Sequence, residues 1–578
     1  MHSPCLKQVE QVCSHGGCCS NPLFSLPEFT YTTTTATATA TTATSTSSAC
    51  RKSFTTTTTT SFFPNTRFTD HESLPSYKES LTTFTQTYPK YSDTARVDRV
   101  RGQEYHHLSL SNRVCLDYIG IGLFSHLQLQ THHSSVPSSS DLPSDFPFFN
   151  TIYKSVNLKS QLLHGGDGSR FESSVRKRIM EFMNISGDDY SMVFTPNKSS
   201  AFKIVSEAYP FQTSRKLLTV YDYKSEAVDA MVTTSERRGA KVMSAEFKWP
   251  RMRIHSARLR KMVERKRKKK KARGLFVFPL QSRTTGASYS YQWMLKAHEN
   301  GWHVLLDACA LGPKDMDSFG LSLIRPDFLI CSFYKVFGEN PSGFGCLFVK
   351  KSIISMMEDS CVGIATLIPA ENSSFQSDDE FSSGTDIELQ QDQPNAQIPE
   401  SSKRLEIEYR GLDHVDSLGL IQISTRTRCL INWLINALTK LEHPNTETKT
   451  PLIEIYGPRI RFDRGPALAF NIYDWKGEKV EPALVQKLSD RNNISLSQGC
   501  LHKIWFDDKY AEEKERVFMA KKGKGVHEIT VVTAAVNFLA SFEDVYRLWA
   551  FVARFLDADY VEKERWRYTA LNQKTIEV

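Results

Sequence analysis

Short apolar runs alternate with segments of helical pattern between residues 191 and 351, and this alternation limits the fold more than any other feature. Apolar strands separated by helices are typical of a mainly parallel sheet with both faces covered. The runs are Met192–Phe194, Leu217–Val220, Leu275–Phe278, Val304–Leu306 and Phe328–Ile330, and helical patterns at 200–208 and 225–237 lie between some of them. We therefore expect an α/β fold in which ligands bind beyond the carboxyl ends of the strands.

The chain has 578 residues, which is enough for two or three domains. The low-complexity segment 32–60, rich in Thr, Ser and Ala, has almost nothing to bury and should not be ordered. After residue 450, strand patterns at 467–472 and 529–532 and helical patterns at 481–488 and 541–556 indicate a small α+β domain. We expect a disordered N-terminal region at 1–105, a large domain at 106–372, an acidic disordered insertion at 373–402, a helical connection at 403–450 and the small domain at 451–560.

Composition excludes several classes of protein. Hydrophobic residues make up 40% and charged residues 24%, as in ordinary globular proteins, and no apolar run reaches the roughly 18 residues of a membrane-spanning helix. The formal net charge is +8, but much of it lies in one run, Arg265–Lys271. We interpret this run as a solvated loop, with a nuclear import signal as the alternative. We therefore expect neither a membrane nor a nucleic acid as a partner.

The twelve cysteines are scattered, which suits reduced thiols better than a disulfide framework. The adjacent pair Cys18 and Cys19 is not followed by a second ligand pair at zinc-finger spacing, so we expect no metal site. These features favour a cytoplasmic protein. The alternatives are nuclear import through Arg265–Lys271, or a plastid, because the Thr and Ser enrichment up to Thr60 resembles a transit peptide with few arginines.

Two charged residues and one polar turn lie at the ends of the predicted strands or at the start of a predicted helix. Lys335 follows an apolar run amid aromatic residues, where desolvation would lower its pKa and leave an amine able to form an imine with an aldehyde. Asp307 ends another run, and a buried aspartate needs a cationic partner such as a protonated pyridine nitrogen. The turn at 195–199 begins a helix whose N-terminus favours an anion, although a simple N-cap would have the same sequence. The three features fit pyridoxal 5′-phosphate (PLP), in the chain order of fold-type I PLP enzymes.

The segment Ser332–Gly338, followed by Pro341–Gly345, resembles the PLP-lysine motif of molybdenum cofactor sulfurases, which are relatives of the cysteine desulfurases in aminotransferase class V. A set of plant sulfurase-like proteins shares this likeness. Further segments resemble the family in the same order, namely Cys115–Gly120, Phe194–Val205, Phe278–Gly286 and Phe542–Val545. The resemblance covers about residues 110–557. It implies a fold-type I PLP-dependent transferase with a mainly parallel sheet in the large domain.

The resemblance also implies roles for single residues. The cofactor-binding residues would be Lys335, Asp307, Tyr223, Lys198, Ser199, Ser332 and Gln281. Lys335 would bind PLP covalently and Asp307 would pair with the ring nitrogen of the same molecule. Lys198 and Ser199 would cradle the phosphate by backbone and hydroxyl groups, with Ser332 as a further donor. Tyr223 would stack on the ring where the family has histidine, unless it is a core aromatic residue, and Gln281 would lie near the ring hydroxyl.

Departures from the family leave the activity open. Thr533 stands where the family has its substrate-carboxylate arginine, and Thr533 cannot form a bidentate ion pair. Arg283 stands where the family has asparagine, so it is either a substitute for that arginine or an exposed loop residue. His502 takes the catalytic cysteine position, and Cys500 is either the sulfur carrier or a bystander thiol, with His502 and Lys503 as groups that could promote its thiolate.

We therefore expect a PLP-binding protein that mobilises sulfur from L-cysteine. One alternative is a catalytically reduced protein that acts through protein interactions, and the other is a PLP-dependent lyase or transferase acting on another amino acid. The resemblance implies a homodimer, in which either Gly384-Thr385 or Gly411-Leu412 reaches the phosphate of the partner. Because only a short tail follows Phe555, we expect that transfer of sulfur to the molybdenum cofactor would need a separate partner.

Overall fold

The computed structural model describes residues 63, 66–134, 149–165, 168–264, 273–319, 325–337, 343–369, 407–444, 451–459, 464–519 and 528–574. Predictions that fall on other residues lie outside this part of the chain. They concern most of the N-terminal region up to residue 65, the basic run Arg265–Lys271, the acidic segment 373–402 and the pair Gly384-Thr385.

A ten-stranded sheet forms the centre of the large domain, with the order β3-β13-β4-β12-β11-β10-β9-β5-β6 and with β2 paired to β11 beside this path. All five apolar runs singled out in the sequence lie in its strands, except that Val220 follows the end of β5. The strands are β2 (Gly122–Phe124), β3 (Phe149–Asn157), β4 (Tyr190–Thr195), β5 (Lys216–Thr219), β6 (Lys241–Ser244), β9 (Gly274–Phe278), β10 (Trp302–Asp307), β11 (Phe328–Val336), β12 (Gly343–Lys350) and β13 (Cys361–Pro369).

The sheet is mixed. Strands β6, β5, β9, β10 and β11 run parallel, as predicted. Strands β12, β4, β13 and β3 join the other side through antiparallel pairs. The predicted α/β class is confirmed. The predicted parallel arrangement is found in the part of the sheet that contains β5, β9, β10 and β11.

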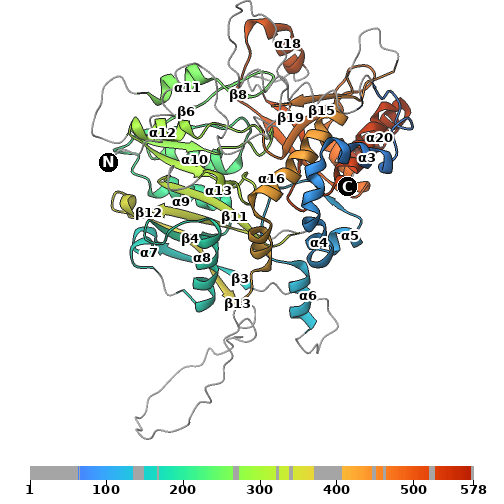
Figure 1. Cartoon of the computed structure of the whole chain (residues 1–578). Helices are drawn as coiled ribbons and strands as arrows, with labels where there is room; N and C mark the ends of the chain where they lie inside the picture. The colour runs from blue at the N-terminus through green and yellow to red at the C-terminus, as the bar shows by residue number, and fades with distance from the viewer. Residues whose placement is uncertain are drawn as a thin grey trace, which may run out of the picture.

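Helices of the large domain cover the sheet (Figure 1). They are α7 (Leu158–His164), α8 (Arg170–Phe182), α9 (Lys198–Ala208), α10 (Glu226–Arg237), α11 (Ser256–Val263), α12 (Gln292–Glu299), α13 (Asp315–Phe319) and α15 (Lys351–Ile354). Helix α9 packs against β11 and β12 with α10 beside it, and α8 packs against β13. The central strands are buried on both faces, with Phe276, Leu305 and Leu329 removed from solvent. This burial explains why their sequences are continuous apolar runs.

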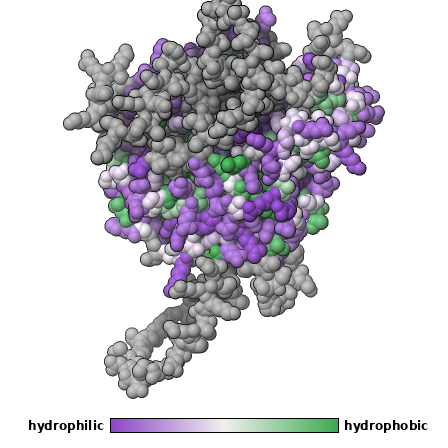
Figure 2. All heavy atoms as spheres, in the orientation of Figure 1, coloured by the Kyte–Doolittle hydropathy of each residue, from purple (hydrophilic) through white to green (hydrophobic). Residues whose placement is uncertain are grey.

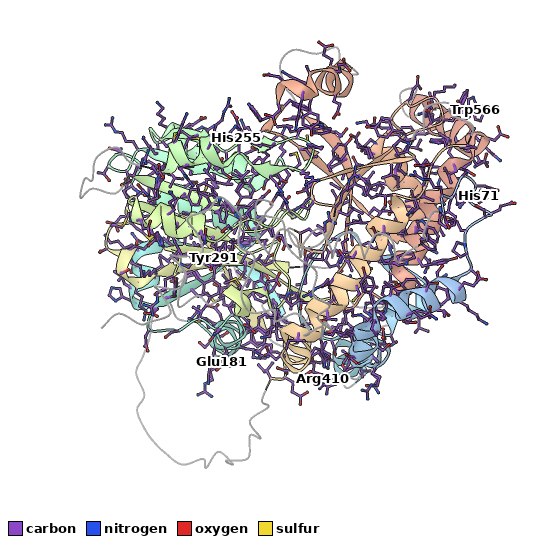
Figure 3. All side chains as sticks on the ribbon, turned by 45° about the horizontal axis from the view of Figure 1, so that its top comes forward. His71, Glu181, His255, Tyr291, Arg410 and Trp566 are labelled. Carbon is purple, nitrogen blue, oxygen red and sulfur yellow. The ribbon has the colours of Figure 1, made fainter. Side chains whose placement is uncertain are left out.

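The small domain is an antiparallel sheet with helices, as predicted for an α+β domain. Its sheet has the order β14 (Ile453–Tyr456), β15 (Ala467–Ile472), β19 (Ile529–Ala535) and β17 (Ser497–Leu501). The main helices are α16 (Arg410–Leu438), α17 (Pro482–Arg491), α18 (Ala511–Met519), α19 (Phe542–Ala553) and α20 (Ala558–Lys574). Ser541 caps α19 and forms a reciprocal capping box with Asp544, so the start signal read from the sequence is confirmed. Figure 3 shows Trp566 of α20 and His71 at the outer edge of this domain.

Two short pairings join the domains. Strand β18 (Ile504–Trp505) of the small domain lies parallel to β7 (Phe247–Lys248), which pairs in turn with β8 (Arg253–Ile254). Strand β16 (Ile494–Ser495) pairs with β1 (Val114–Cys115), which precedes the large sheet. These pairings hold β17, which lies between β16 and β18 in the chain, close to the large domain.

The prediction of disorder for residues 1–105 is wrong for its last part. Helices α3 (Tyr77–Thr87) and α4 (Ala95–Glu104) lie beside the C-terminal helices, where Figure 1 shows blue and red elements together. The ring of Phe84 stacks on Phe542 at 4.4 Å and meets Trp433 edge-on. These helices therefore gain their apolar cover from α16 and α19, which no local sequence pattern reveals. The short helices α5 (His107–Leu110) and α6 (His126–Ser134) follow them.

The described surface is polar, and the described helices give no sign of a membrane span. The face drawn in Figure 2 is mostly hydrophilic where residues are described, with scattered hydrophobic side chains. Within the described ranges, no helix is both long and apolar enough to span a bilayer.

A Cβ atom on Gly411 would lie 2.1 Å from the carbonyl oxygen of Gly122, and Leu412 is fully buried. This segment therefore packs inside its own chain, so the prediction that Gly411-Leu412 could reach a partner is wrong.

Candidate cofactor site at the carboxyl edge of the sheet

Asp307 is the last residue of β10 and its side chain is fully removed from solvent. The Lys198 ammonium lies 2.7 Å from its Oδ2 atom, and the Tyr221 hydroxyl donates to the same oxygen at 3.0 Å. The backbone N–H of Cys309 donates to Oδ1 at 3.0 Å. Burial alone would raise the pKa of Asp307, but the Lys198 charge and these hydrogen bonds hold it below its ordinary value. The buried group is therefore a carboxylate with a cationic partner, as the sequence predicted.

Lys198 supplies that cation from the first turn of α9. The preceding Asn197 caps this helix, because its Oδ1 accepts a hydrogen bond from the Ser200 N–H at 2.9 Å. The N-cap interpretation is thus confirmed, and Ser199 is half-buried beside it. The Lys198 side chain does not extend into solvent, since it is 16% exposed and turned to Asp307. Burial opposes the ammonium, yet Asp307 raises the pKa of Lys198 above its ordinary value.

Tyr223 lies next to this ion pair. Its ring lies 5.6 Å from that of Tyr221, and the residue is 2% exposed. Its hydroxyl has no hydrogen-bond partner among the described residues. The positive charges of Lys198 and Arg283 both act on Tyr223. A buried hydroxyl without a partner is costly, so it indicates a place where a ligand completes the site.

Lys335 is not part of this cluster. Its Nζ atom lies 4.9 Å from the ring centroid of Phe149, and burial lowers its pKa without help from any charged neighbour. Strand β11 pairs with β12 as far as Tyr334, so side chains alternate between its faces. Ser332 lies within hydrogen-bond reach of the Cys309 thiol, and the charges of Lys198 and Arg283 act on Tyr334, so these two side chains lie on the face of β11 toward Cys309 and Lys198.

In this structure Lys335 and Asp307 therefore do not face the same space, and the prediction that both meet one ring stays a prediction. The cause is the register of β11, which leaves Lys335 on the face of Phe333, whose ring lies 6.2 Å from that of Phe182 in α8. Tyr334 takes the opposite face, where its ring packs against Gly120 and lies 5.2 Å from Tyr118.

Gln281 lies at the boundary between the domains. Its Nε2 donates to the carbonyl of Ala310 at 2.8 Å, three residues beyond the end of β10. A Cβ atom on Gly465 of the small domain would lie 2.2 Å from the Gln281 amide. Gln281 is therefore fixed between the large sheet and the small domain. Arg283, two residues further along the chain, is exposed, and its charge acts on Tyr223 and Tyr334.

The strand β17 brings Cys500 and His502 to the same edge. The Cys500 carbonyl accepts a hydrogen bond from the Lys224 N–H at 2.7 Å, and the His502 N–H donates to the Asp222 carbonyl at 3.0 Å. The Cys500 thiol donates to Glu528 Oε2 at 3.3 Å. Burial lowers the pKa of His502, so it is not a ready source of positive charge for the thiol.

Thr533 and Arg464 lie at the same boundary. Thr533 is 9% exposed in β19, and a Cβ atom on Gly499 would touch both it and Thr284. The Arg464 guanidinium is buried and donates one hydrogen bond, from Nη2 to the Thr285 carbonyl at 2.9 Å. Its Nε and Nη1 atoms have no partner among the described residues, and burial lowers its pKa to about 9.

Sequence reasoning missed four residues of this region, namely Tyr221, Cys309, Tyr334 and Arg464. Tyr221 directly follows the run Leu217–Val220, and Cys309 follows Asp307, so the rule that ligands meet strand ends could have found both. Tyr334 depends on the facing of β11. Arg464 depends on how the small domain packs, which the sequence does not show.

The donor set fits the two polar ends of PLP. Asp307 offers a buried carboxylate for a ring nitrogen, and Lys198 with the start of α9 offers a cation and backbone N–H groups for a phosphate. The Tyr223 hydroxyl is a further group that awaits a partner. Lys335 does not complete this set in the structure described, because its amine lies on the other face of β11.

Comparisons with known proteins agree with the sequence motifs. No protein-family model matches the chain. The molybdenum cofactor sulfurase of Bos taurus is 25% identical over 431 residues, covering 68% of this chain and 43% of the bovine protein. That of Caenorhabditis elegans is 27% identical over 369 residues, covering 61% and 48%, and that of Solanum lycopersicum is 23% identical over 467 residues, covering 74% and 52%. The chain thus spans about half the length of these relatives.

Solved structures give weaker likenesses. The cysteine desulfurase CsdA of Escherichia coli is 16% identical with a TM-score of 0.48, covering 80% of this chain and 98% of that one. A cysteine desulfurase of Thermococcus onnurineus is 15% identical with a TM-score of 0.44, covering 69% and 88%. The family assignment rests on the sequence relatives and on the motifs that carry the likeness. The chain is thus similar in sequence to molybdenum cofactor sulfurases.

Proposed function

We propose that this chain binds PLP beside Asp307 and mobilises sulfur from L-cysteine. PLP, when bound, supplies an electron sink for bonds around the α-carbon of an amino acid. The observation that carries the proposal is the buried Asp307 carboxylate, paired with Lys198 and Tyr221 and lying beside a Tyr223 hydroxyl that has no partner among the described residues. The sulfurase relatives support the sulfur chemistry.

In this proposal Asp307 would keep the ring nitrogen protonated, and Tyr223 would provide an aromatic side chain for the ring. Lys335 would provide the amine that binds the aldehyde, since burial lowers its pKa and so favours the reactive neutral form. This role requires the end of β11 to exchange the facing of Tyr334 and Lys335 when PLP binds. The described pairing with β12 ends at Tyr334, so Lys335 is held there only by the parallel pairing of Tyr334 and Val336 with β2.

Arg283 and Cys500 would act on the substrate. Arg283, whose charge acts on Tyr223, would bind the carboxylate of the amino acid. The Cys500 thiol, whose S–H donates to Glu528 at 3.3 Å, would lose its proton to solvent, and its sulfur would attack the substrate sulfur. A sulfur–sulfur bond forms while the carbon–sulfur bond of cysteine breaks, and the electron pair stays with the substrate carbon until a proton converts it to alanine. Cys500 would then carry the sulfur.

A catalytically reduced protein is the second candidate. The observations that favour it are Thr533 in place of an arginine and the position of Lys335 away from Asp307. Such a protein would keep the pocket and act through protein interactions. We also expect a homodimer and a cytoplasmic location, which light scattering and imaging of a tagged protein would test.

Sulfide release from L-cysteine in the presence of excess thiol reductant separates the candidates. The proposal predicts sulfide from the wild type and its loss in Cys500→Ala, with activity kept in Cys361→Ala, whose thiol is exposed on β13. Absence of sulfide from PLP-loaded wild type would favour the reduced protein. In that case, spectral changes with a panel of other amino acids would reveal a different PLP-dependent reaction.

A further inference from the structure

The ion pair between Lys198 and Asp307 occupies a site in which the proposed cofactor would itself bring two charges. The Asp307 side chain is fully buried, the Lys198 side chain is 16% exposed, and their charged atoms lie 2.7 Å apart. A buried ion pair is held together because either partner alone would be an uncompensated charge. A PLP molecule carries a ring nitrogen that suits Asp307 and a phosphate that suits Lys198. One PLP molecule could therefore provide a new partner for both Asp307 and Lys198.

We propose that Lys198 is an exchangeable counterion of the cofactor site, an inference that rests on the proposed function. Without cofactor, Lys198 neutralises Asp307. When PLP binds, the Lys198 ammonium transfers to the phosphate, and Asp307 is released to the protonated ring nitrogen. No covalent bond changes, and the number of positive and negative protein charges in the site is the same before and after the exchange.

The position of Lys198 supports this exchange. It is the first residue of the eleven-residue helix α9, so its side chain starts where the free backbone N–H groups of the helix lie. Its ammonium also lies 5.5 Å from the ring of Phe202 in the next turn of α9, which provides an apolar wall beside the flexible side chain. A lysine has three donors on a rotatable stem and can change partners without moving its backbone.

Tyr223 is the second, independent sign that a ligand belongs here. It is 2% exposed, and its hydroxyl has no hydrogen-bond partner among the described residues. Tyr221, by contrast, is satisfied by Asp307 Oδ2, the same oxygen that Lys198 holds. If Lys198 leaves, the protein donors to Asp307 are the Tyr221 hydroxyl and the Cys309 N–H. The Asp307 carboxylate can then accept a further hydrogen bond from a ring N–H.

The exchange predicts a strong preference for phosphorylated ligands. A ring without phosphate offers a cation to Asp307 but offers no anion to Lys198, which would then be buried without a partner. A fixed structural ion pair would behave differently, because Lys198 would stay on Asp307 and the phosphate would add only the contacts of the helix terminus. The effect of replacing Lys198 on the preference for phosphorylated ligands therefore distinguishes an exchangeable counterion from a fixed ion pair.

The test compares pyridoxamine 5′-phosphate with pyridoxamine, which have no aldehyde and so bind without Lys335 chemistry. Dissociation constants are measured by fluorescence titration of the full-length chain freed of cofactor, for the wild type, Lys198→Gln and Lys203→Gln. Lys203 is on the same helix with a 61% exposed side chain and serves as the matched control. We expect the wild type and Lys203→Gln to prefer the phosphorylated compound, and Lys198→Gln to lose about tenfold or more of that preference.

An unchanged preference in Lys198→Gln overturns the exchange while leaving PLP binding intact. Failure of the wild type to bind either compound overturns the proposed function itself, so the two failures are distinct. If Lys198→Gln does not fold, the double variant Lys198→Gln/Asp307→Asn carries the same test, because it removes both charges of the pair. Lys198→Arg keeps a cation and should retain much of the preference, and its loss there would contradict the counterion role.

Discussion

The backbone carbonyl of Cys500 accepts a hydrogen bond from the backbone N–H of Lys224 at 2.7 Å. This bond joins β17 of the small domain to the segment that follows β5, directly beside Tyr223. An isolated bridge between Tyr223 and Leu501 extends the contact. Cys500 is thus held at the edge of the Asp307 cluster by backbone contacts, although its position in the sequence is far from that cluster.

Glu528 should restrain the reactivity of this thiol. Its carboxylate accepts the Cys500 S–H, and a nearby negative charge disfavours a thiolate. Glu528→Gln is therefore expected to raise the rate of Cys500 alkylation by iodoacetamide severalfold near neutral pH. Mass spectrometry would follow the labelled peptide, with Cys361 as the exposed reference thiol. An unchanged rate would show that Glu528 does not control Cys500.

Removal of the Asp307 charge should destabilise the protein without cofactor. Asp307→Asn leaves the buried Lys198 ammonium without its carboxylate, and loss of one partner of a buried pair costs about 3–5 kcal/mol. Urea unfolding would measure the loss, with Asp359→Asn at an exposed position as the control. Equal stability of the two variants would contradict the described ion pair.

The same carboxylate predicts a pH dependence. The pKa of Asp307 is lower in the folded protein than its ordinary value of 3.8, because Lys198 and the hydrogen bonds outweigh burial. The folded state therefore binds this proton less readily than the unfolded state does. The stabilisation is fully present above the ordinary pKa and is lost as the pH falls through the lower folded pKa. Wild type should lose more stability than Asp307→Asn in this acid range, and parallel curves would disprove the linkage.

Imine formation at Lys335 should depend on pH in the alkaline range. Burial lowers the pKa of Lys335 below its ordinary value of 10.5, so the reactive neutral amine is present at lower pH than for a solvated lysine. The rate of the spectral change on adding PLP should rise with pH to a midpoint below that value. It should vanish in Lys335→Ala and persist in Lys177→Ala, which has an 80% exposed side chain. A midpoint at the ordinary value would indicate reaction with surface lysines.

The N-terminal helices should contribute directly to stability. Phe84 is fully buried between Phe542 and Trp433, so Phe84→Ala should cost about 3–5 kcal/mol through lost contacts and a cavity. Gln86→Ala, at an exposed position of the same helix, should change the free energy of unfolding little. A negligible effect of Phe84→Ala would mean that α3 does not pack on the small domain.

The sequence predicts the class of the fold because the strands of the large sheet are buried on both faces. Their apolar runs, such as Leu275–Phe278 and Phe328–Ile330, need no partner information to be recognised. Asp307, Lys198 and Tyr223 could be predicted as neighbours because each lies at a strand end or a helix start on one edge of the sheet.

Other features depend on contacts between distant segments. The facing of Lys335 is set by the register of β11 with β12, where Tyr334 pairs with Gly343, and a shift of one residue would reverse it. The order of α3 depends on Phe84 meeting Phe542 near the other end of the chain. The Lys198–Asp307 pair was not foreseen, because the family resemblance gave Lys198 a phosphate to bind.

Borohydride reduction of the PLP-treated protein, followed by peptide mapping, tests the proposed cofactor site most directly. Reduction fixes PLP to the lysine that holds it. The account predicts a pyridoxyl group on the peptide that contains Lys335, formed in the wild type and strongly reduced in Asp307→Asn. A label confined to surface lysines, or one on Lys335 that does not depend on Asp307, would contradict a site in which these two residues hold the same molecule.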